Sequence, residues 1–153
     1  MSDLLQRLRR RGWRLTAQRR AVAEVLVGEH VHLTADEVRE RAVGRLPEIS
    51  RATVYNTLHE LVEMGELLEV SIGGGAKLYD PKAQEPHQHL ICDTCGLVRD
   101  VHVRNERALT LAPAERHGFT VVAVDVTFRG ACATCAGARG HSSRPRRTKK
   151  HHR

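Results

Sequence analysis

Apolar residues recur at helical spacing along the first third of the chain, interrupted by glycine, proline and good N-cap residues. A short helix is expected over residues 3–11, ending at Gly12, and a second helix is expected to begin after Thr16. Thr34 and Glu37 stand at the spacing of a capping box, so a third helix should start at Thr34. The apolar positions of the first two helices are Leu4, Leu5, Leu8, Ala21, Val22, Val25 and Leu26.

A fourth amphipathic segment, "ISRATVYNTLHELVEMGEL", predicts a helix capped by Ser50 and stopped at Gly65. Two short strands should follow, over 67–72 and 76–80, joined by a glycine turn. Helices followed by a hairpin are the order of a winged helix, in which the last helix enters the major groove of DNA. An ordinary amphipathic helix with a polar outer face would show the same pattern. The expected buried face is Val54, Leu58, Leu61 and Val62.

The outer face of this fourth helix carries side chains that can contact DNA. Arg51 can reach a phosphate or a guanine edge, and Asn56 can hydrogen-bond adenine. Tyr55, Thr53 and Thr57 can contact phosphate or a thymine methyl group. Arginines near the N-terminus add positive charge to this part of the chain. The predicted DNA-contacting residues are Arg14, Arg19, Arg51, Thr53, Tyr55 and Asn56.

From residue 86 onward, strand-like alternation replaces helical spacing, and β-branched residues dominate. Strands are expected in "HQHLICDTC", "GLVRDVHV" and "FTVVAVDVTFRG", and "RNERALTLAPAERHG" predicts a helix that Pro113 interrupts or shortens. The link "DPKAQEP" has two prolines and no periodicity, which marks a boundary. We therefore predict an α+β fold. Its parts are a winged helix-turn-helix domain over 1–79, a hinge over 80–86, a small α/β domain over 87–135 and a basic disordered tail over 136–153.

Charge is unevenly distributed along the chain, whose formal net charge is +7. Residues 1–20 hold seven arginines and one aspartate, and residues 136–153 hold seven basic residues and no acid, whereas the middle is acidic. Basic segments beside a folded module suit contact with phosphates, although the tail could equally serve solubility. No apolar run reaches the ~18 residues of a membrane span. The N-terminus lacks the apolar stretch of a secretory signal, so a cytoplasmic protein is expected.

Cys92 and Cys95 form one Cys-x-x-Cys pair and Cys132 and Cys135 form another, and together they are all the cysteines of the chain. In a reducing compartment such pairs more often bind metal than form disulfides. Four thiolates complete a tetrahedral shell suited to Zn²⁺ and leave no position for a substrate, so a structural zinc site is predicted. An iron–sulfur or rubredoxin-like centre, or two reversible disulfides, would use the same residues.

His87 and His89 stand two residues apart in a predicted strand, so both side chains should point to the same side. Because four thiolates need no histidine, this pair serves a second metal site or none. Mixed imidazole and carboxylate ligation suits an exchangeable Fe²⁺, Mn²⁺ or Zn²⁺. Ligands drawn from both domains would let the metal fix the angle between them, which would act as a switch. Further candidate ligands are His32, Asp80 and Asp100. His30 and His102 are also candidates by position but, like His59 and His117, are interpreted as ordinary surface histidines.

Several segments, in order, resemble the ferric uptake regulator family across about residues 5–135. They are "RLTAQRRAVAEVL", "HLTADEV", "EISRATVYNTLHELVEMGEL", "HQHLICDTCGLVRDV" and the terminal "CATC". The resemblance implies a homodimeric bacterial repressor with an N-terminal winged helix and a C-terminal α/β dimerisation domain, in which metal loading sets the DNA-binding arrangement. A two-fold dimer should read an inverted-repeat operator in double-stranded DNA.

The resemblance also assigns metal ligands. Cys92, Cys95, Cys132 and Cys135 match a structural Zn²⁺ site, and His32, Asp80, His87, His89 and Asp100 match a regulatory site between the domains. Aspartate at positions 80 and 100, where iron-uptake members typically have glutamate, is similar to the peroxide-responsive repressors, in particular actinobacterial repressors of catalase genes. That subfamily implies Fe²⁺ or Mn²⁺ at the regulatory site, oxidation of His32 or His87 by hydrogen peroxide, and release of the operator.

Two features depart from the family pattern. The stretch from Asp80 to His87 is one residue longer than usual, and another family metal site lacks its histidine in the late strand. Two other functions also fit part of the sequence. An iron- or zinc-uptake repressor of the same family would respond to metal level and not to peroxide. A non-haem iron enzyme could use two histidines and a carboxylate, but up to five protein ligands leave little room for substrate, so no enzymatic activity is expected.

Overall fold

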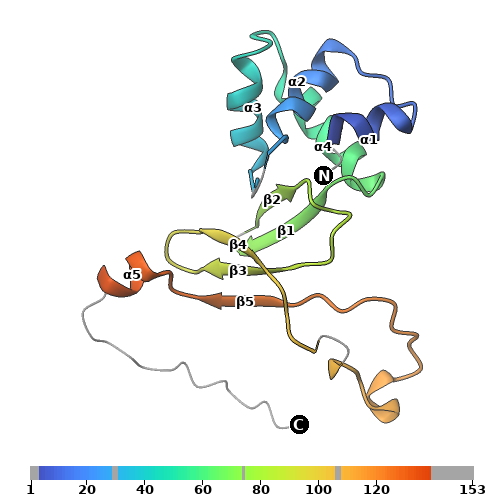
Figure 1. Cartoon of the computed structure of the whole chain (residues 1–153), viewed down its shortest axis with the longest axis vertical. Helices are drawn as coiled ribbons and strands as arrows, with labels where there is room; N and C mark the ends of the chain where they lie inside the picture. Colours follow the sequence, from blue (N-terminus) through green and yellow to red (C-terminus); the bar gives the residue numbers. More distant parts are fainter. Residues whose placement is uncertain (1–3, 29–30, 74, 106–107, 139–153) are drawn as a thin grey trace.

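The structure is a computed structural model that describes residues 4–28, 31–73, 75–105 and 108–138 of the chain. Helices gather at one end, a two-stranded hairpin lies beside them, and a three-stranded sheet continues toward the other end (Figure 1). The four N-terminal helices are α1 (Leu4–Arg10), α2 (Ala17–Val25), α3 (Ala35–Val43) and α4 (Arg51–Glu63). The remaining elements are β1 (Leu68–Gly73), β2 (Ala76–Asp80), β3 (Gln88–Cys92), β4 (Val98–Val101), η2 (Pro113–Arg116), β5 (Thr127–Gly130) and α5 (Ala133–Ala138). The predicted α+β fold is confirmed.

The helix starts predicted from capping residues are confirmed. The Thr34 hydroxyl accepts from Glu37 N at 3.2 Å, and Glu37 Oε2 accepts from Thr34 N at 2.7 Å, which completes the capping box of α3. Ser50 Oγ accepts from Thr53 N at 3.0 Å and caps α4. Gly65 follows α4 with φ at +70°, the left-handed conformation that ends helices. Thr16 is the N-cap of α2.

The four helices share one apolar core. Leu8 of α1, Val22 of α2, Val38 of α3 and Leu58 of α4 are fully buried in it. Tyr79 of the hairpin is buried in the same core, so one face of the hairpin packs against helices α1 to α4. Burial of side chains such as these stabilises the fold by roughly 1.5–3 kcal/mol each. These four helices are called the helical unit below.

A buried carboxylate joins α1 to the start of the hairpin. Glu66 is 1 % exposed, and its two oxygens lie 2.6 Å from Arg7 Nε and 2.9 Å from Arg11 Nε. Arg7 Nη2 also donates to the carbonyl of Pro81 at 3.1 Å. Helix α1 therefore contacts the chain directly after Asp80, the last residue of β2.

The other face of the hairpin packs on the second sheet. β1 and β2 are antiparallel, and the second sheet has the order β4-β3-β5, with β3 antiparallel to β4 and parallel to β5. Val70 and Leu78 of the hairpin form a small buried cluster with Ile91 of β3 and Val98 of β4. Because side chains alternate along a strand, the residues two positions from this cluster lie on the same facing surfaces.

The structure corrects the prediction for residues 104–118. Among residues 104–105 and 108–118, which the structure describes, none is α-helical. Pro113 starts the 3-10 turn η2, and His117 and Gly118 follow it with positive φ values of 45° and 81°. The preceding Asn105 also has a positive φ, 61°, which an α-helix does not accommodate. The helix predicted for this stretch is therefore reduced, in the described residues, to short 3-10 turns.

The late strand is also shorter than predicted. Within "FTVVAVDVTFRG" only β5 is paired, and its neighbours before Thr127 lack strand partners in the described chain. Phe119 and Val122 in that segment are 77 % and 93 % exposed. Of the second predicted strand, "GLVRDVHV", only Val98–Val101 is β4.

Two further predictions are adjusted by the structure. Thr57, assigned to the outer face of α4, is 4 % exposed, and its hydroxyl donates to the Thr53 carbonyl at 2.8 Å. Helix α5 extends into residues 136–138, which composition assigned to the tail, and the rest of the predicted disordered tail lies outside the described residues. No helix in the described ranges has the length and apolar character needed to cross a membrane.

Candidate metal centres

The four cysteines meet where β3 and β5 end. Cys92 closes β3, and the turn after it is tight because Gly96 N donates to the Cys92 carbonyl at 2.9 Å, with Gly96 at φ +73°. Parallel pairing sets Gly130 of β5 opposite Cys92, so Cys132 follows two residues later at the same edge. Cys132 N donates to Cys92 Sγ at 3.3 Å. Strand register thus joins two pairs that are distant in sequence.

The geometry of the cysteine cluster fits zinc. The four sulfur atoms lie within 4.8 Å of one another, and all four cysteines are free thiols. Cys95 Sγ and Cys132 Sγ are 3.8 Å apart. Sulfurs bonded at about 2.3 Å to a tetrahedral Zn²⁺ would be separated by about 3.8 Å. The observed spacing therefore suits a closed four-cysteine zinc site and is too long for a disulfide, whose sulfurs lie about 2.05 Å apart.

Electrostatics inside the cluster also favour a cation. Backbone N–H groups of Cys132, Cys95 and Thr94 lower the pKa of Cys92 to about 6. Hydrogen bonds with the neighbouring thiols of Cys132 and Cys95 raise the pKa of Cys135 to about 12. Cys92 therefore ionises readily, whereas Cys135 is held protonated. A divalent cation among the sulfurs would favour the thiolate form of all four.

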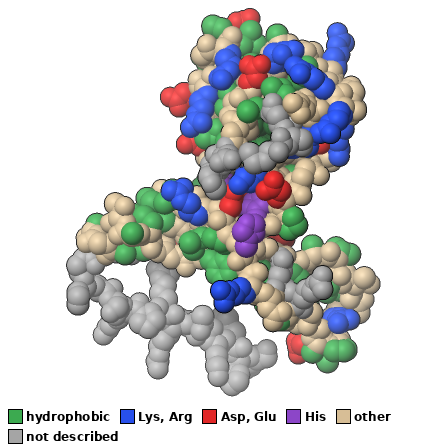
Figure 2. All heavy atoms as spheres, in the orientation of Figure 1, with side chains coloured by type: hydrophobic (Ala, Val, Ile, Leu, Met, Phe, Trp, Pro, Cys, Tyr) green, Lys and Arg blue, Asp and Glu red, His purple; other side chains and the backbone are tan. Residues whose placement is uncertain are grey.

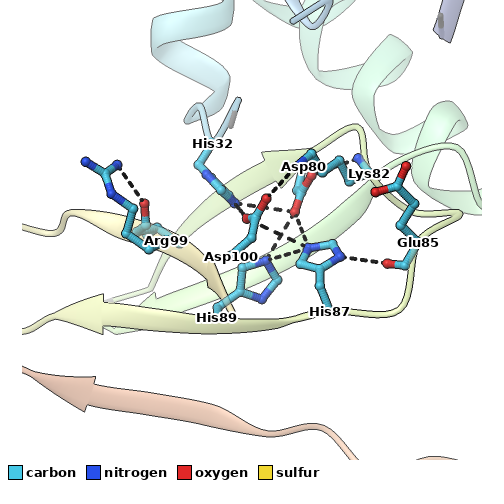
Figure 3. A network of polar contacts seen from close by, with 9 residues as sticks. His32, Asp80, Lys82, Glu85, His87, His89, Arg99 and Asp100 are labelled. Atoms are coloured by element: carbon cyan, nitrogen blue, oxygen red, sulfur yellow. Dashed lines mark hydrogen bonds and ion pairs between the residues drawn. The ribbon is translucent and has the colours of Figure 1, made fainter. Parts of the chain in front are cut away.

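A second cluster of candidate ligands lies next to the apolar contact between the hairpin and the second sheet. Asp80 is two residues beyond Leu78 on β2, and His89 is two residues before Ile91 on β3, so both side chains enter the gap between these strands. Asp100 of β4 is the direct cross-strand partner of His89. Figure 3 shows these side chains pointing toward one another, with His32 approaching from the helical unit.

His32 reaches this cluster through a backbone bridge. Leu33 and Tyr79 form an isolated antiparallel bridge, and each is the chain neighbour of a cluster residue, His32 and Asp80 respectively. The side chain of His32 is 6 % exposed. Figure 2 shows histidine side chains at the junction between the helical unit and the strands.

The donor atoms converge on two carboxylate oxygens. His87 Nε2 and His89 Nε2 lie 2.8 Å and 3.1 Å from Asp80 Oδ2. His32 Nε2 lies 2.8 Å from Asp100 Oδ1 and 3.4 Å from Asp80 Oδ2. One donor atom from each of His32, Asp80, His89 and Asp100 lies within 4.8 Å of the others. His87 is not one of those four, but its Nε2 lies 4.0 Å from Asp100 Oδ1 and 3.2 Å from His89 Nε2, at the edge of the same cluster.

The contact between His32 and Asp100 supports a shared cation. His32 Nε2 is buried and, despite the 2.8 Å separation from Asp100 Oδ1, its geometry is not that of a hydrogen bond. A ring nitrogen and a carboxylate oxygen that lie this close together suit joint ligation of one cation. Three imidazole nitrogens and two carboxylate oxygens are the ligand set of Fe²⁺, Mn²⁺ or Zn²⁺ in exchangeable sites.

The protonation of the cluster agrees with this arrangement. Burial alone would raise the pKa of Asp80, but polar contacts with His32, His89, the backbone N–H of Lys82 and His87 outweigh it and hold that pKa well below its usual range. Burial also opposes ionisation of Asp100, whose pKa is nevertheless lowered, chiefly by a hydrogen bond from Lys82. Both carboxylates are therefore anionic, as metal ligands must be.

The orientation of His87 is set from outside the cluster. Its Nδ1 lies 2.7 Å from the Glu85 carbonyl, which can only accept, so Nδ1 carries the proton and Nε2 faces Asp80. Such a contact fixes both the tautomer and the direction of a metal-binding imidazole. Burial lowers the pKa of His87, but the contacts with Glu85 and Asp80 outweigh this and leave it raised.

Sequence reasoning did not single out Lys82. Its ammonium lies 2.9 Å from Asp100 Oδ2, and its backbone N donates to Asp80 Oδ1 at 2.8 Å. The hydrogen bond to Asp100 raises the pKa of Lys82, so the side chain is charged. The only signal in the sequence was its position two residues after Asp80, in the hinge.

The candidate DNA-contacting residues differ in what holds their side chains. Tyr55 is 40 % exposed, and Asn56 is also exposed. Arg51 lies over the Tyr55 ring, 5.6 Å from its centroid, and 2.9 Å from Asp36 Oδ1. Thr53 is half-buried, and its hydroxyl lies 2.8 Å from that of Ser50.

Arg19 is held more firmly than Arg51. Its guanidinium donates to both oxygens of Glu60, at 2.8 Å and 2.7 Å, and to the carbonyl of Arg14 at 3.2 Å. It also lies 4.7 Å from the centre of the Trp13 ring, whose N–H donates to the same Glu60. These contacts suit a role in shaping the segment that carries the exposed Arg14.

Comparison with known proteins agrees with this architecture. Residues 10–129 match the model of the ferric uptake regulator family. The peroxide operon regulator of Bacillus subtilis is 32 % identical over 141 residues, which cover 92 % of this chain and 97 % of the relative. The peroxide stress regulator of Campylobacter jejuni superposes with a TM-score of 0.62 and 28 % identity, covering 88 % of this chain and 100 % of that one.

A third comparison concerns the fold. The Helicobacter pylori ferric uptake regulator, described as having three functional metal-binding sites, superposes with a TM-score of 0.70 at 20 % identity, covering 91 % of this chain and 94 % of that one. Solved proteins of this fold include forms with iron, zinc and manganese. Members of the family are dimeric, DNA-binding transcription regulators and not enzymes. With a four-cysteine cluster and a histidine–aspartate cluster in place, this chain belongs to the ferric uptake regulator family of metal-responsive transcriptional regulators.

Proposed function

We propose that this regulator is a repressor that senses hydrogen peroxide through Fe²⁺ at the histidine–aspartate cluster and releases operators of oxidative-stress genes such as catalase genes. The observation that carries the proposal is the convergence of His32, Asp80, His87, His89 and Asp100 from both parts of the molecule. A cation held by ligands from both parts stabilises the arrangement that joins them. The similarity to peroxide regulators supports peroxide as the signal.

In this proposal His32 or His87 is the oxidation target. Ferrous iron, when bound, supplies the redox chemistry that activates hydrogen peroxide. One imidazole carbon then gains an oxygen atom in place of its hydrogen, the displaced hydrogen moves to a ring nitrogen, and the second peroxide oxygen leaves as water. The oxidised ring is a poorer ligand, so the two parts separate. A cleft of about 390 Å³ reaches His87 and His89, whose side chains are 2 % and 10 % exposed.

The remaining residues have supporting roles in the proposal. Cys92, Cys95, Cys132 and Cys135 hold a structural Zn²⁺ that ties the ends of the domain at 87–135 together. The winged helix over 1–79 binds DNA, and residues 80–86 are the hinge. The exposed Phe119 and Val122 support burial of this segment against a second subunit. A homodimer would read an inverted repeat, and the basic residues of 136–153 would add salt-sensitive affinity.

Six residues are proposed to contact the operator through α4 and the N-terminal segment. Arg51, Tyr55 and Asn56 lie on the exposed face of α4 and are suited to base edges and phosphates. Arg14 offers an exposed charge, while Arg19 and Thr53 are more restrained. The proposed contacts are Arg14, Arg19, Arg51, Thr53, Tyr55 and Asn56.

Peroxide treatment of the iron-loaded protein tests the proposal. Zinc-loaded protein is supplied anaerobically with Fe²⁺ or Mn²⁺ and bound to an operator selected from random-sequence DNA. One equivalent of hydrogen peroxide should abolish binding by the iron form and add one oxygen to the peptide containing His32 or His87. The manganese form should keep both its mass and its DNA.

The alternative is an iron- or zinc-uptake repressor, and it predicts a different result. Iron-loaded protein would then keep its operator after peroxide and release it only when a chelator removes the metal. Repeated turnover of peroxide without loss of DNA binding would instead indicate an enzyme. The sensor reacts once per site.

A further inference from the structure

Asp80 and Asp100 of the histidine–aspartate cluster each direct one carboxylate oxygen toward histidine and the other toward Lys82. Asp80 Oδ2 faces His87 and His89, whereas Asp80 Oδ1 accepts from the backbone N of Lys82 at 2.8 Å. Asp100 Oδ1 faces His32, whereas Asp100 Oδ2 lies 2.9 Å from Lys82 Nζ. One residue therefore engages the outer oxygen of both carboxylates.

We propose that Lys82 is a positioning residue of the regulatory metal centre. It turns each carboxylate so that only one oxygen of Asp80 and one of Asp100 is offered to the cation. This inference rests on the proposed metal site but not on its reaction with peroxide. Three imidazoles and two single oxygens make five ligands, which leaves a sixth position for a small molecule.

The position of Lys82 makes this role specific. Two residues after Asp80, its backbone N–H is within reach of the Asp80 side chain, as in an Asx turn. Its ammonium crosses to β4, and with 27 % of the side chain exposed it remains partly shielded from water. The neighbouring Arg99 does not share the task, because its guanidinium donates to the Val98 carbonyl (Figure 3).

The ammonium group of Lys82 should also change the affinity of the site for its metal. A positive charge bound to Asp100 competes with the cation for the same carboxylate and repels it through space. Lys82 should therefore weaken metal binding while it holds the geometry. A weaker site exchanges its cation more readily, which suits a regulator that responds to changing metal supply.

Three substitutions at this position separate geometry from charge. Lys82→Met removes both the charge and the hydrogen bond, Lys82→Gln removes the charge but keeps a donor, and Lys82→Arg keeps both. Lys77→Met is a matched control, because Lys77 pairs with Glu69 at 2.6 Å on the hairpin and contacts no candidate ligand. Each variant is purified with zinc in the cysteine site, and its zinc content and thermal unfolding are checked.

Two measurements report on the metal centre itself. The ligand-field absorption of Co²⁺ added to the zinc-loaded protein reports coordination number, and competition titration gives the Mn²⁺ affinity. In Lys82→Met, Asp100 Oδ2 loses its contact with the ammonium and can turn to the cation, so the Co²⁺ bands should weaken. Removal of the competing positive charge should make Mn²⁺ bind on the order of tenfold more tightly. Lys82→Gln should keep the Co²⁺ spectrum with tighter Mn²⁺ binding. Lys82→Arg and Lys77→Met should match the original chain in both.

The proposal is overturned if the Co²⁺ spectrum of Lys82→Met equals that of the original chain, or if Lys82→Arg changes it as much as Lys82→Met does. Neither readout involves peroxide. A changed spectrum in a protein that ignores peroxide would therefore support the role of Lys82 while it rejects peroxide sensing.

Discussion

Leu33 and Tyr79 exchange two backbone hydrogen bonds, with Tyr79 N donating to Leu33 O at 2.8 Å and Leu33 N donating to Tyr79 O at 3.3 Å. This bridge fixes the segment before α3 against β2, and it sets His32 beside Asp80. The histidine–aspartate cluster therefore depends on backbone pairing between the segment before α3 and β2 as well as on its side chains.

Breaking this bridge should weaken the metal site in addition to its effect on the fold. Leu33→Pro removes the N–H that bonds Tyr79 O and should lower Mn²⁺ affinity by roughly ten- to hundredfold, since a support for a ligand is lost. Leu33→Ala keeps both backbone bonds but leaves a cavity, so it should cost about 2–5 kcal/mol of stability and keep its Mn²⁺ affinity. Titration with Mn²⁺ and urea unfolding separate the two effects. Equal metal affinities for the two variants would reject the role of the bridge.

The buried Glu66 should matter for stability. Glu66→Gln leaves Arg7 and Arg11 without their carboxylate and should destabilise the protein by roughly 2–4 kcal/mol, a range below the full cost of breaking a buried pair because Arg11 is half exposed. Glu63→Gln is the control, because Glu63 pairs with His59 at the surface and should change stability by less than about 1 kcal/mol. Urea unfolding measures both. Similar values for the two variants would contradict the structural role of Glu66.

Loss of a cysteine should act on the second sheet and not on the helical unit. Cys95→Ser removes one of four sulfurs, so zinc content should fall to near zero and the dimer should dissociate or unfold. Zinc analysis and size-exclusion chromatography check this. His32→Ala, in the other cluster, should keep its zinc and its fold but lose metal-dependent DNA binding. A Cys95→Ser protein that retains zinc and its assembly state would exclude a structural site built from all four cysteines.

Structural features that depend on residues close together in the sequence were predictable. Contacts between residues far apart in the sequence were not. The Thr34–Glu37 capping box depends on residues three positions apart, so its pattern suffices. The cysteine pairs were also recognisable, because no other cysteines compete for the metal. His32 and Asp80, by contrast, are joined by a backbone bridge that no periodicity reveals, and only family resemblance selected them.

Two of the wrong predictions concern burial. Alternation and helical spacing indicate which side chains need burial, but not whether this chain alone provides the partner surface. Val122 follows the strand pattern and is nevertheless 93 % exposed. Thr57 shows the opposite case, since a residue type common on surfaces satisfies its hydroxyl on the Thr53 carbonyl and is buried.

Arg51 should need little free energy to leave its intramolecular ion pair and contact DNA. Its pair with Asp36 is exposed on both sides, and such pairs contribute about 0–1 kcal/mol. Arg51→Ala should weaken binding to a selected operator by about 1–3 kcal/mol, and Tyr55→Ala should weaken it also, with zinc content unchanged in both. Asp36→Asn, which frees Arg51, should bind at least as tightly as the original chain. Fluorescence anisotropy at two salt concentrations measures these changes. Normal binding by both Arg51→Ala and Tyr55→Ala would show that α4 is not the recognition helix.

Metal binding should strengthen as pH rises. The pKa of His87 is raised above its ordinary 6.5, since contacts with Glu85 and Asp80 outweigh the effect of burial. Below that raised pKa, protonated His87 pairs with Asp80 and stabilises the metal-free protein, and this contribution is lost as pH rises through it. A cation must displace this proton, whereas Asp80 and Asp100 are already ionised because their pKa values are lowered.

Mn²⁺ affinity measured at about pH 6, 7 and 8 should therefore increase by up to about tenfold per unit for each proton released. His59→Gln should leave this profile unchanged, because His59 is exposed and pairs only with Glu63 among the contacts described. An affinity that stays constant from pH 6 to 8 would mean that no histidine of the cluster gives up a proton to the metal. Such a result would contradict the competition between proton and metal at His87.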